Sequence, residues 1–370
     1  MWYYGVEKEN AVRRNAMFGL SVFLGNDLTE DKKQYLKQMK EAGFVSVFTS
    51  LHIPEEDADQ YMQRLMDLAS LVKKWDMELI ADISKGALEK LGISIHSASS
   101  LEKLKRIGLT GLRVDYGFTN QEIAFMSNSL DIALNASTIT EKDVEELVQY
   151  GANFHQMTAM HNYYPRPETG LAKEVFQQKN VWLNEIGFTV ASFVSGDEEL
   201  RGPLFQHLPT LEDHRELHPL AAALESLKDC AVDAVYIGDP TISAVTLEQF
   251  KHYIQEDTIL FHVEPINQSP YFERILGKHQ NRWDPAKDVL RSADARFKEI
   301  TEIEPHETSS RFRGAVTLDN NRYQRYMGET QVVVHELPAD EKVNVVAQIK
   351  KEDLSLLDWC VAGSQFELKN

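Results

Sequence analysis

Short apolar runs alternate with longer amphipathic segments along most of the chain, beginning at Met17. Each short run is rich in Val, Ile, Leu or Phe and is bounded by polar residues or glycine, as expected of buried β-strands. Eight of these runs are predicted as strands, at residues 18–24, 44–50, 78–84, 111–117, 130–137, 154–160, 188–194 and 232–238.

The segments between these runs carry apolar residues at helical spacing. In TEDKKQYLKQMKEAG, for example, Leu36 and Met39 recur on one helical face and Gly43 ends the pattern. Eight strand–helix units within about 240 residues predict a closed (β/α)8 TIM barrel. A doubly wound open sheet is the competing fold, but no GxGxxG sequence follows the first predicted strand.

The alternation of strands and helices ends after a helix predicted at about 246–255. The rest of the chain predicts strands in TILFHVEP, FRGAVTL, ETQVVVHEL, EKVNVVAQI and CVAGSQFEL. ETQVVVHEL and EKVNVVAQI flank a PAD turn and are predicted to pair as a hairpin. We therefore predict an N-terminal extension (1–16), a barrel domain (17–256) and a mainly β domain (257–370).

The formal net charge of −18 makes nucleic acid and anionic membranes poor partners, although a locally positive pocket can still bind a small anion. Cys230 and Cys360 are far apart in the sequence and are predicted to be reduced, buried thiols. No apolar run approaches the roughly 18 residues that span a bilayer. The apolar stretch after Arg14 lacks a signal-peptide cleavage site, so a cytoplasmic protein is predicted.

Acidic residues follow several predicted strands at the end of the barrel where catalytic residues are found. Asp82 and Asp115 end their strands, Asp239 follows the eighth strand, and Glu212 lies in the loop after the seventh. Two such acids can supply the acid and base, or acid and nucleophile, that break a glycosidic bond. Asp115 is the first choice as catalytic carboxylate, and the other three compete for the second role. Glu212 and Asp239 can alternatively cap a helix or a turn.

Aromatic and arginine side chains on the predicted rim loops suit a sugar or phosphate ligand. The segment HNYYPRPETGL (161–171) follows the sixth strand, and its prolines favour an extended backbone that presents Tyr164 and Arg166. Arg201 and Arg215 lie on the next rim loop. DNNRYQRYMGE (319–329), in the predicted β domain, has the composition of a binding loop.

Metal binding is a minor alternative. His214 and His218 are four residues apart, a spacing that can place two zinc ligands on one helical face, but no HExxH sequence occurs there. No metal or other cofactor is expected.

Several motifs together resemble a bacterial family once labelled "outer surface protein", to which a 6-phospho-N-acetylmuramidase activity is assigned. They are LRVDYGF, HNYYPRPETGL, RGPLFQHLPTLEDHR, YIGDP, DNNRYQRYMGE and KVNVVAQI, and the resemblance covers the chain from Met17 onward. It implies a glycosidase-type TIM barrel followed by a cyclophilin-like β-barrel domain. It also implies a cytoplasmic enzyme that hydrolyses the β-1,4 bond of MurNAc-6-phosphate–GlcNAc in peptidoglycan recycling.

The expected partner is thus a phosphorylated amino-sugar disaccharide, and the chain is expected to be able to form a homo-oligomer. Side chains predicted to bind sugar hydroxyls, the phosphate or the lactyl carboxylate are Asn135, Asn162, Tyr164, Arg166, Arg215, Arg325 and Tyr326. Two alternatives remain open at this stage: a non-catalytic phosphosugar-binding or regulatory protein, and a metal-dependent phosphosugar aldolase or epimerase.

Overall fold

A computed structural model of the chain describes residues 16–25, 27–50, 58–90, 92–114, 117–295 and 302–370. The predicted strands form a closed parallel barrel in sequence order, and β1 pairs with β8 to complete it. The strands are β1 (Met17–Ser21), β2 (Ser46–Ser50), β3 (Glu78–Asp82), β4 (Gly111–Val114), β5 (Asp131–Asn135), β6 (Met157–Met160), β7 (Thr189–Val194) and β8 (Ala234–Ile237). The predicted (β/α)8 barrel is therefore confirmed.

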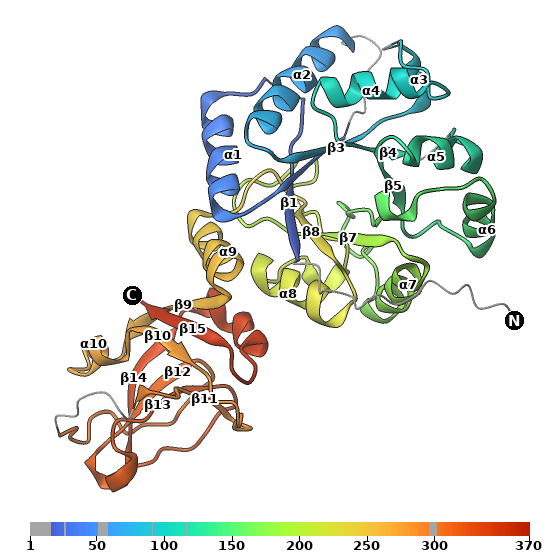
Figure 1. Ribbon diagram of the computed structural model, residues 1–370. Coiled ribbons are helices and arrows are strands. Elements are labelled where there is room, and N and C mark those ends of the chain that lie inside the picture. Colours follow the sequence, from blue (N-terminus) through green and yellow to red (C-terminus); the bar gives the residue numbers. More distant parts are fainter. Residues whose placement is uncertain (1–15, 26, 51–57, 91, 115–116, 296–301) are drawn as a thin grey trace, which may run out of the picture.

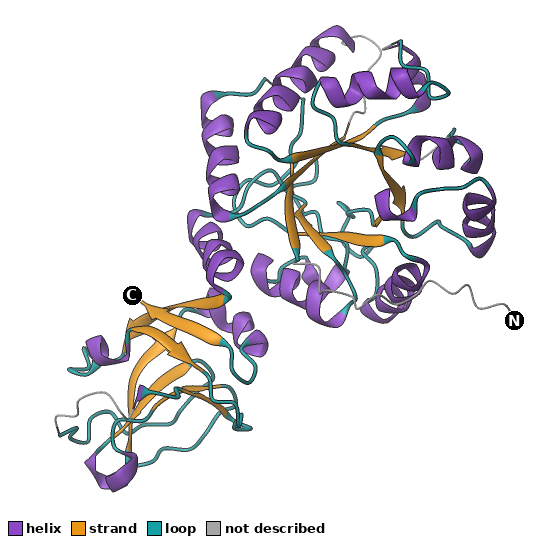
Figure 2. Ribbon diagram, viewed as in Figure 1, coloured by secondary structure: helices purple, strands orange, loops and turns teal. Residues whose placement is uncertain are grey.

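Helices surround the ring of strands, as Figures 1 and 2 show. They are α1 (Glu30–Ala42), α2 (Ala58–Lys74), α3 (Lys85–Lys90), α4 (Ala98–Arg106), α5 (Asn120–Ser127), α6 (Glu141–Gln149), α7 (Lys173–Ile186), α8 (Pro219–Asp229) and α9 (Ala244–Glu256). Thr119 and Thr140 each begin a helix with a capping box, which satisfies the free N–H groups of the first turn. Short 3-10 turns, η1 (Phe154–Gln156) and η2 (Glu212–His214), lie between these elements.

The interior of the barrel is packed with aromatic and small side chains. The ring of Phe193 contacts Phe48 and Tyr236, with centroid separations of 5.3 and 5.7 Å. The hydroxyl of Tyr236 in β8 hydrogen-bonds the hydroxyl of Ser46, the first residue of β2, at 2.9 Å. Gly19 of β1 faces Tyr236, and a Cβ added at Gly19 would lie 2.3 Å from a ring carbon. The barrel interior is therefore a filled core, and a ligand is expected to bind at the carboxyl ends of the strands.

A mixed β-sheet domain follows the barrel and lies beside α9 in Figure 1. Its strands are β9 (Thr258–Pro265), β10 (Gly277–Gln280), β11 (Val289–Arg291), β12 (Ala315–Asp319), β13 (Thr330–Val333), β14 (Val343–Ile349) and β15 (Gln365–Lys369). Their order in the sheet is β10-β15-β9-β14-β12-β13-β11, and this sheet curls into a half-barrel. Short helical segments α10 (Phe272–Ile275), η4 (Asn321–Tyr326) and η5 (Lys351–Trp359) complete the domain. The predicted mainly β fold of the C-terminal region is thus confirmed.

The predicted hairpin around the PAD turn is wrong. β12 lies between β13 and β14 and pairs with both of them. The segment after β13 instead pairs Leu337 with Arg311 before the chain returns to β14. The turn residues mark a change of direction, but strand pairing is decided by packing across the whole sheet.

Gly19→Ala should destabilise the protein by about 1–3 kcal/mol, because the added methyl group overpacks the barrel interior against Tyr236. Gly86→Ala in α3 is the matched control, since its Cβ meets nothing within 4 Å. Urea unfolding of both variants measures the difference. Equal free energies of unfolding for the two variants would contradict this description of the barrel interior.

Candidate active site

Three polar side chains meet where β3, β4 and β6 end. Asp82 is the last residue of β3, and its strand partner Arg113 lies in β4. Arg113 donates from Nη1 to Asp82 Oδ2 at 3.2 Å and from Nη2 to the amide oxygen of Asn162, two residues beyond β6. Arg113 is 5% exposed, so this buried cation is neutralised by Asp82 and oriented by Asn162.

An aromatic–guanidinium group lies at the same end of the barrel. The ring of Tyr163 packs edge-on against Phe193, with centroids 5.2 Å apart. Arg201 donates to the Tyr163 hydroxyl at 2.5 Å, and its guanidinium lies 3.9 Å from the centroid of the Phe23 ring. Burial raises the pKa of the Tyr163 phenol, while the Arg201 charge opposes this shift. Because the phenol oxygen accepts from Arg201, its own proton remains for donation to a ligand.

Glu212 fixes the loop that contains HNYYPRPETGL. Its carboxylate accepts hydrogen bonds from the backbone N–H groups of Glu168 and Gly170, at 2.8 and 2.7 Å. Arg215 donates to both carboxylate oxygens at 2.7 Å. The Arg215 hydrogen bonds, followed by those from the backbone, lower the pKa of Glu212 to about 2. Glu212 is therefore an ionised anchor for the loop.

Arg215 is itself 7% exposed, and its remaining N–H groups donate to backbone carbonyls, including Gln206 O at 2.7 Å. Its guanidinium is therefore occupied within the protein. On the same loop, Tyr164 is half-buried and donates its backbone N–H to Pro209 O at 2.8 Å. Arg166 is exposed. At the end of β5, the Asn135 side chain accepts from the Ser137 N–H at 3.1 Å.

Asp239 organises the loop between β7 and α8. The carboxylate is 1% exposed and accepts from the backbone N–H groups of Gly196, Leu208 and Arg201, at 2.9, 3.0 and 3.4 Å. Burial raises the pKa of Asp239, and these backbone donors oppose the shift. These three hydrogen bonds all come from the backbone of one loop, so Asp239 holds that loop in place.

Asp115, which directly follows β4 in the sequence, lies outside the described residues. Two other predicted site residues lie away from the barrel mouth. Arg325 and Tyr326 lie in η4, in the C-terminal domain at the end away from the barrel (orange-red in Figure 1), where Arg325 Nη2 donates to the Tyr326 hydroxyl at 2.8 Å. Sequence reasoning did not identify Arg113. The alternation in GLRVD was the available signal, because it places Arg113 on the inward side of its strand.

The C-terminal domain also contains a buried acid next to η4. Asp319, the last residue of β12, is 4% exposed. Burial, with added repulsion from Glu329 and Asp340, raises the pKa of Asp319 to about 8. Glu329 differs because Arg291 pairs with it, with Nε and Oε1 2.8 Å apart. Asp319 is therefore protonated at neutral pH.

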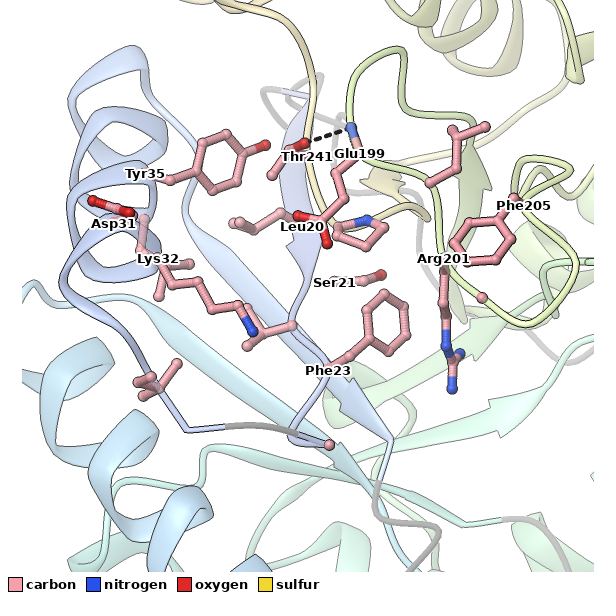
Figure 3. A pocket seen from close by; sticks show the side chains of 17 residues that line it. Leu20, Ser21, Phe23, Asp31, Lys32, Tyr35, Glu199, Arg201, Phe205 and Thr241 are labelled. Atoms are coloured by element: carbon pink, nitrogen blue, oxygen red, sulfur yellow. Dashed lines mark hydrogen bonds between the residues drawn. The ribbon is translucent and has the colours of Figure 1, made fainter.

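A cavity of about 330 Å³ opens between α1 and the β7–α8 loop (Figure 3). Ser21 of β1 and Phe23 line its centre, Lys32 enters from α1, and Arg201 and Glu199 enter from the loop. Arg201 also donates to the hydroxyl of Tyr163, the residue after Asn162. The cavity therefore lies next to the Asp82–Arg113–Asn162 group at the barrel mouth.

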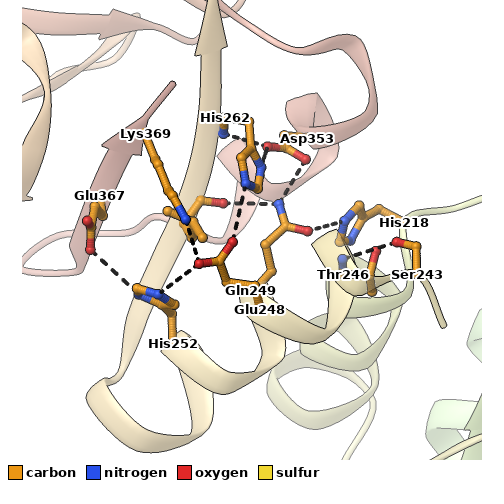
Figure 4. Close-up of polar contacts among 11 residues, drawn as sticks. His218, Ser243, Thr246, Glu248, Gln249, His252, His262, Asp353, Glu367 and Lys369 are labelled. Atoms are coloured by element: carbon orange, nitrogen blue, oxygen red, sulfur yellow. Dashed lines mark hydrogen bonds and ion pairs between the residues drawn. The ribbon is translucent and has the colours of Figure 1, made fainter. Parts of the chain in front are cut away.

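The histidines considered as metal ligands are engaged in other contacts. His214 Nε2 lies 2.8 Å from the Glu225 carboxylate. His218 hydrogen-bonds Gln249, which donates to Asp353 of η5 at 2.8 Å, and Asp353 also accepts from the backbone and ring of His262 in β9 (Figure 4). This buried network joins α8 and α9 of the barrel to the C-terminal sheet. Among the described residues, no group of three or more His, Cys, Asp or Glu could hold a metal ion.

Together, the fold and the site define a TIM-barrel protein with a polar candidate site at the carboxyl ends of its strands. Family models for the N-terminal and C-terminal parts of 6-phospho-N-acetylmuramidase match residues 18–252 and 259–369. The chain belongs to the 6-phospho-N-acetylmuramidase family.

Two solved structures resemble the chain over nearly its whole length. One is a conserved protein of unknown function from Enterococcus faecalis, with 49% identity, a TM-score of 0.88, and coverage of 95% of this chain and 96% of that one. The other is an uncharacterized B. cereus protein, with 26% identity, a TM-score of 0.74, and coverage of 96% and 100%. No curated protein matches the chain. None of the described helices is both long and apolar enough to cross a membrane.

Glu212→Gln should lower the free energy of unfolding at pH 7 by about 2–3 kcal/mol, because it leaves the buried Arg215 cation without its counter-charge. Solvent near the partly exposed Glu212 screens the charge and keeps the loss from being larger. The pKa of Glu212 is lowered to about 2, so this stabilisation is present above the ordinary value of 4.5 and is lost as the pH falls towards 2. Urea titrations at pH 7 and pH 3.5, with exposed Glu145→Gln as control, measure the difference. A variant as stable as the control at pH 7 would refute the anchoring role.

Asp319→Asn should stabilise the protein increasingly, relative to the unmodified chain, as the pH rises from about 4 to 8. The pKa of Asp319 is raised from an ordinary 3.8 to about 8, so the folded chain holds a proton that the unfolded chain has lost, and stability declines across this window. Melting temperatures measured from pH 4 to 8, with exposed Asp294→Asn as control, test this. Parallel curves for the unmodified chain and Asp319→Asn would show that this carboxyl is not buried as described.

Proposed function

We propose that this protein is a cytoplasmic glycoside hydrolase that cleaves the β-1,4 bond of MurNAc-6-phosphate–GlcNAc in peptidoglycan recycling. The observation that carries the proposal is the Asp82–Arg113–Asn162 group, which lies at the open end of a TIM barrel in a chain of the 6-phospho-N-acetylmuramidase family. Glycosidases of most families act through two carboxyl groups beside the scissile bond, one protonated and one ionised.

Asp82 supports the ionised role. Its carboxylate pairs with the buried guanidinium of Arg113, which favours the negative form and holds its position. Its side chain is 18% exposed, so it remains within reach of a ligand. In this position it would attack the anomeric carbon, activate a water molecule, or orient the 2-acetamido group if that group is the nucleophile.

Asp115 is the proposed proton donor to the glycosidic oxygen. It follows β4 in the sequence, two residues after Arg113, and lies outside the described residues, so its role rests on its sequence position. Glu212 and Asp239, the other predicted carboxylates, are less suitable because backbone N–H groups or Arg215 already bind their oxygens. They are proposed to hold the loops that surround the substrate.

The neighbouring polar groups are suited to hold a sugar ring. The Asn162 and Asn135 amides and the Tyr163 phenol carry donors and acceptors, and Tyr163 also presents an aromatic ring. Tyr164 and Arg166, on the loop anchored by Glu212, are proposed to border the same ligand. A rigid loop positions such groups at little entropic cost on binding.

Hydrolysis of MurNAc-6-phosphate–GlcNAc by the full chain tests the proposal. Asp82→Asn and Asp115→Asn should each lower kcat by about a hundredfold or more, as expected for loss of a catalytic carboxyl group. Asp213→Asn is the matched control, because Asp213 is an exposed rim acid outside the proposed mechanism, and it should keep its activity.

Circular dichroism should show that all three variants are folded. Full activity in folded Asp82→Asn would remove Asp82 from the mechanism. If the unmodified chain binds the phosphorylated sugar but never cleaves the disaccharide, the alternative of a non-catalytic phosphosugar-binding protein replaces the proposal.

A further inference from the structure

The arginines near the barrel mouth differ in whether an anionic ligand can reach their charge. Arg113 is paired with Asp82, and Arg215 is paired with Glu212. Arg201 forms no ion pair with any described residue: its guanidinium contacts the Tyr163 hydroxyl and the Phe23 ring. Within the described part of the chain, no carboxylate neutralises its charge.

A second available cation lines the same cavity. Lys32 of α1 is half-buried and makes no ion pair with the described residues, whereas Lys33 and Lys37 of the same helix pair with Glu30 and Glu41. Figure 3 shows the ends of Lys32 and Arg201 on either side of Phe23. The cavity lining thus contains two cations, Lys32 and Arg201, together with the carboxylates of Asp31 and Glu199.

A buried hydroxyl group between these cations also lacks a partner. Ser21 Oγ is in a residue that is 2% exposed, and it has no hydrogen-bond partner among the described residues. Figure 3 places Ser21 at the centre of the cavity, next to Phe23. A buried hydroxyl without a partner is costly, and a ligand oxygen at this point would satisfy it.

The position at which many TIM barrels bind phosphate is blocked in this protein. That position lies at the loops after strands 7 and 8, beside a helix N-terminus. At the N-terminus of α9, the Asp197 carboxylate already accepts from Ser243 N at 2.7 Å and from the Thr246 hydroxyl at 2.5 Å. A phosphate there would compete with Asp197 for these donors, whereas the cavity offers Lys32, Arg201 and the Ser21 hydroxyl.

We infer that this cavity is the subsite for the phosphomonoester of the substrate sugar, with Lys32 and Arg201 as charge partners and Ser21 as a hydroxyl donor. The inference rests on the proposed phosphosugar substrate. Glu199 also lines the cavity, and its carboxylate is directed towards Leu20 and Ser21 in Figure 3, where it would accept a hydrogen bond from a sugar hydroxyl. Asp31 is exposed and lies at the outer edge. Arg201 then bridges the phosphate and Tyr163 at the mouth.

Calorimetric binding to the full chain tests the assignment with three probes: MurNAc-6-phosphate, GlcNAc-6-phosphate and unphosphorylated MurNAc. Lys32→Met and Arg201→Met should each weaken binding of both phosphorylated sugars by about tenfold or more, as expected for loss of a charge-assisted contact. Binding of MurNAc should be unchanged in Lys32→Met. Ser21→Ala should weaken the phosphorylated sugars by a smaller factor.

Lys37→Met is the matched control, because Lys37 lies on the same helix outside the cavity. If both methionine variants keep the preference for phosphorylated sugars, the assignment is overturned. If they lose affinity for MurNAc but keep it for GlcNAc-6-phosphate, the cavity takes the lactyl carboxylate and the phosphate assignment is again overturned.

The assignment and the proposed function fail in different ways. Phosphate-dependent binding through Lys32 and Arg201 without hydrolysis of the disaccharide would support the subsite and contradict the glycosidase. Hydrolysis with a preference for phosphorylated substrate that neither variant alters would support the glycosidase and contradict the subsite.

Discussion

The buried guanidinium of Arg113 is the charge on which the arrangement of the barrel mouth depends. A cation that is 5% exposed needs a counter-charge and hydrogen-bond acceptors to offset its loss of solvation. Asp82 supplies the charge from β3, and Asn162 supplies an oxygen from beyond β6. Three strands that are not all neighbours are thereby tied together at one point. The proposed catalytic carboxylate is part of this structural pairing, so the Arg113 guanidinium also fixes its position.

The three acids that competed for the second catalytic role fall into two groups in the structure. Glu212 and Asp239 bind backbone N–H groups and hold two loops, whereas Asp82 binds a side chain and remains partly open. Asp239 also accepts from the backbone of Arg201, so the loop it organises carries the cation proposed to bind phosphate. The structural acids and the proposed ligand site are thus directly connected.

Periodicity was sufficient to predict the barrel, because each strand is a continuous apolar run and each helix has one apolar face. The predicted strand boundaries also placed Asp82 and Asn162 at the same end of the barrel, where both contact Arg113. The roles of Glu212 and Arg215 could not be predicted from the sequence. Glu212 binds the backbone of residues some 40 positions away, and Arg215 acts by pairing with Glu212. Lys32 could not be singled out either, because its amphipathic helix carries several lysines and the sequence does not show which of them lines a cavity. The PAD turn misled because a local turn signal does not specify which strands pair.

A crystal structure of the full chain with MurNAc-6-phosphate tests the central claim most directly. The account predicts the sugar at the barrel mouth, with its anomeric carbon facing Asp82 and its phosphate within hydrogen-bonding distance of Lys32 and Arg201. A sugar bound in the C-terminal domain near Arg325, or one at the mouth that does not approach Asp82, would contradict it.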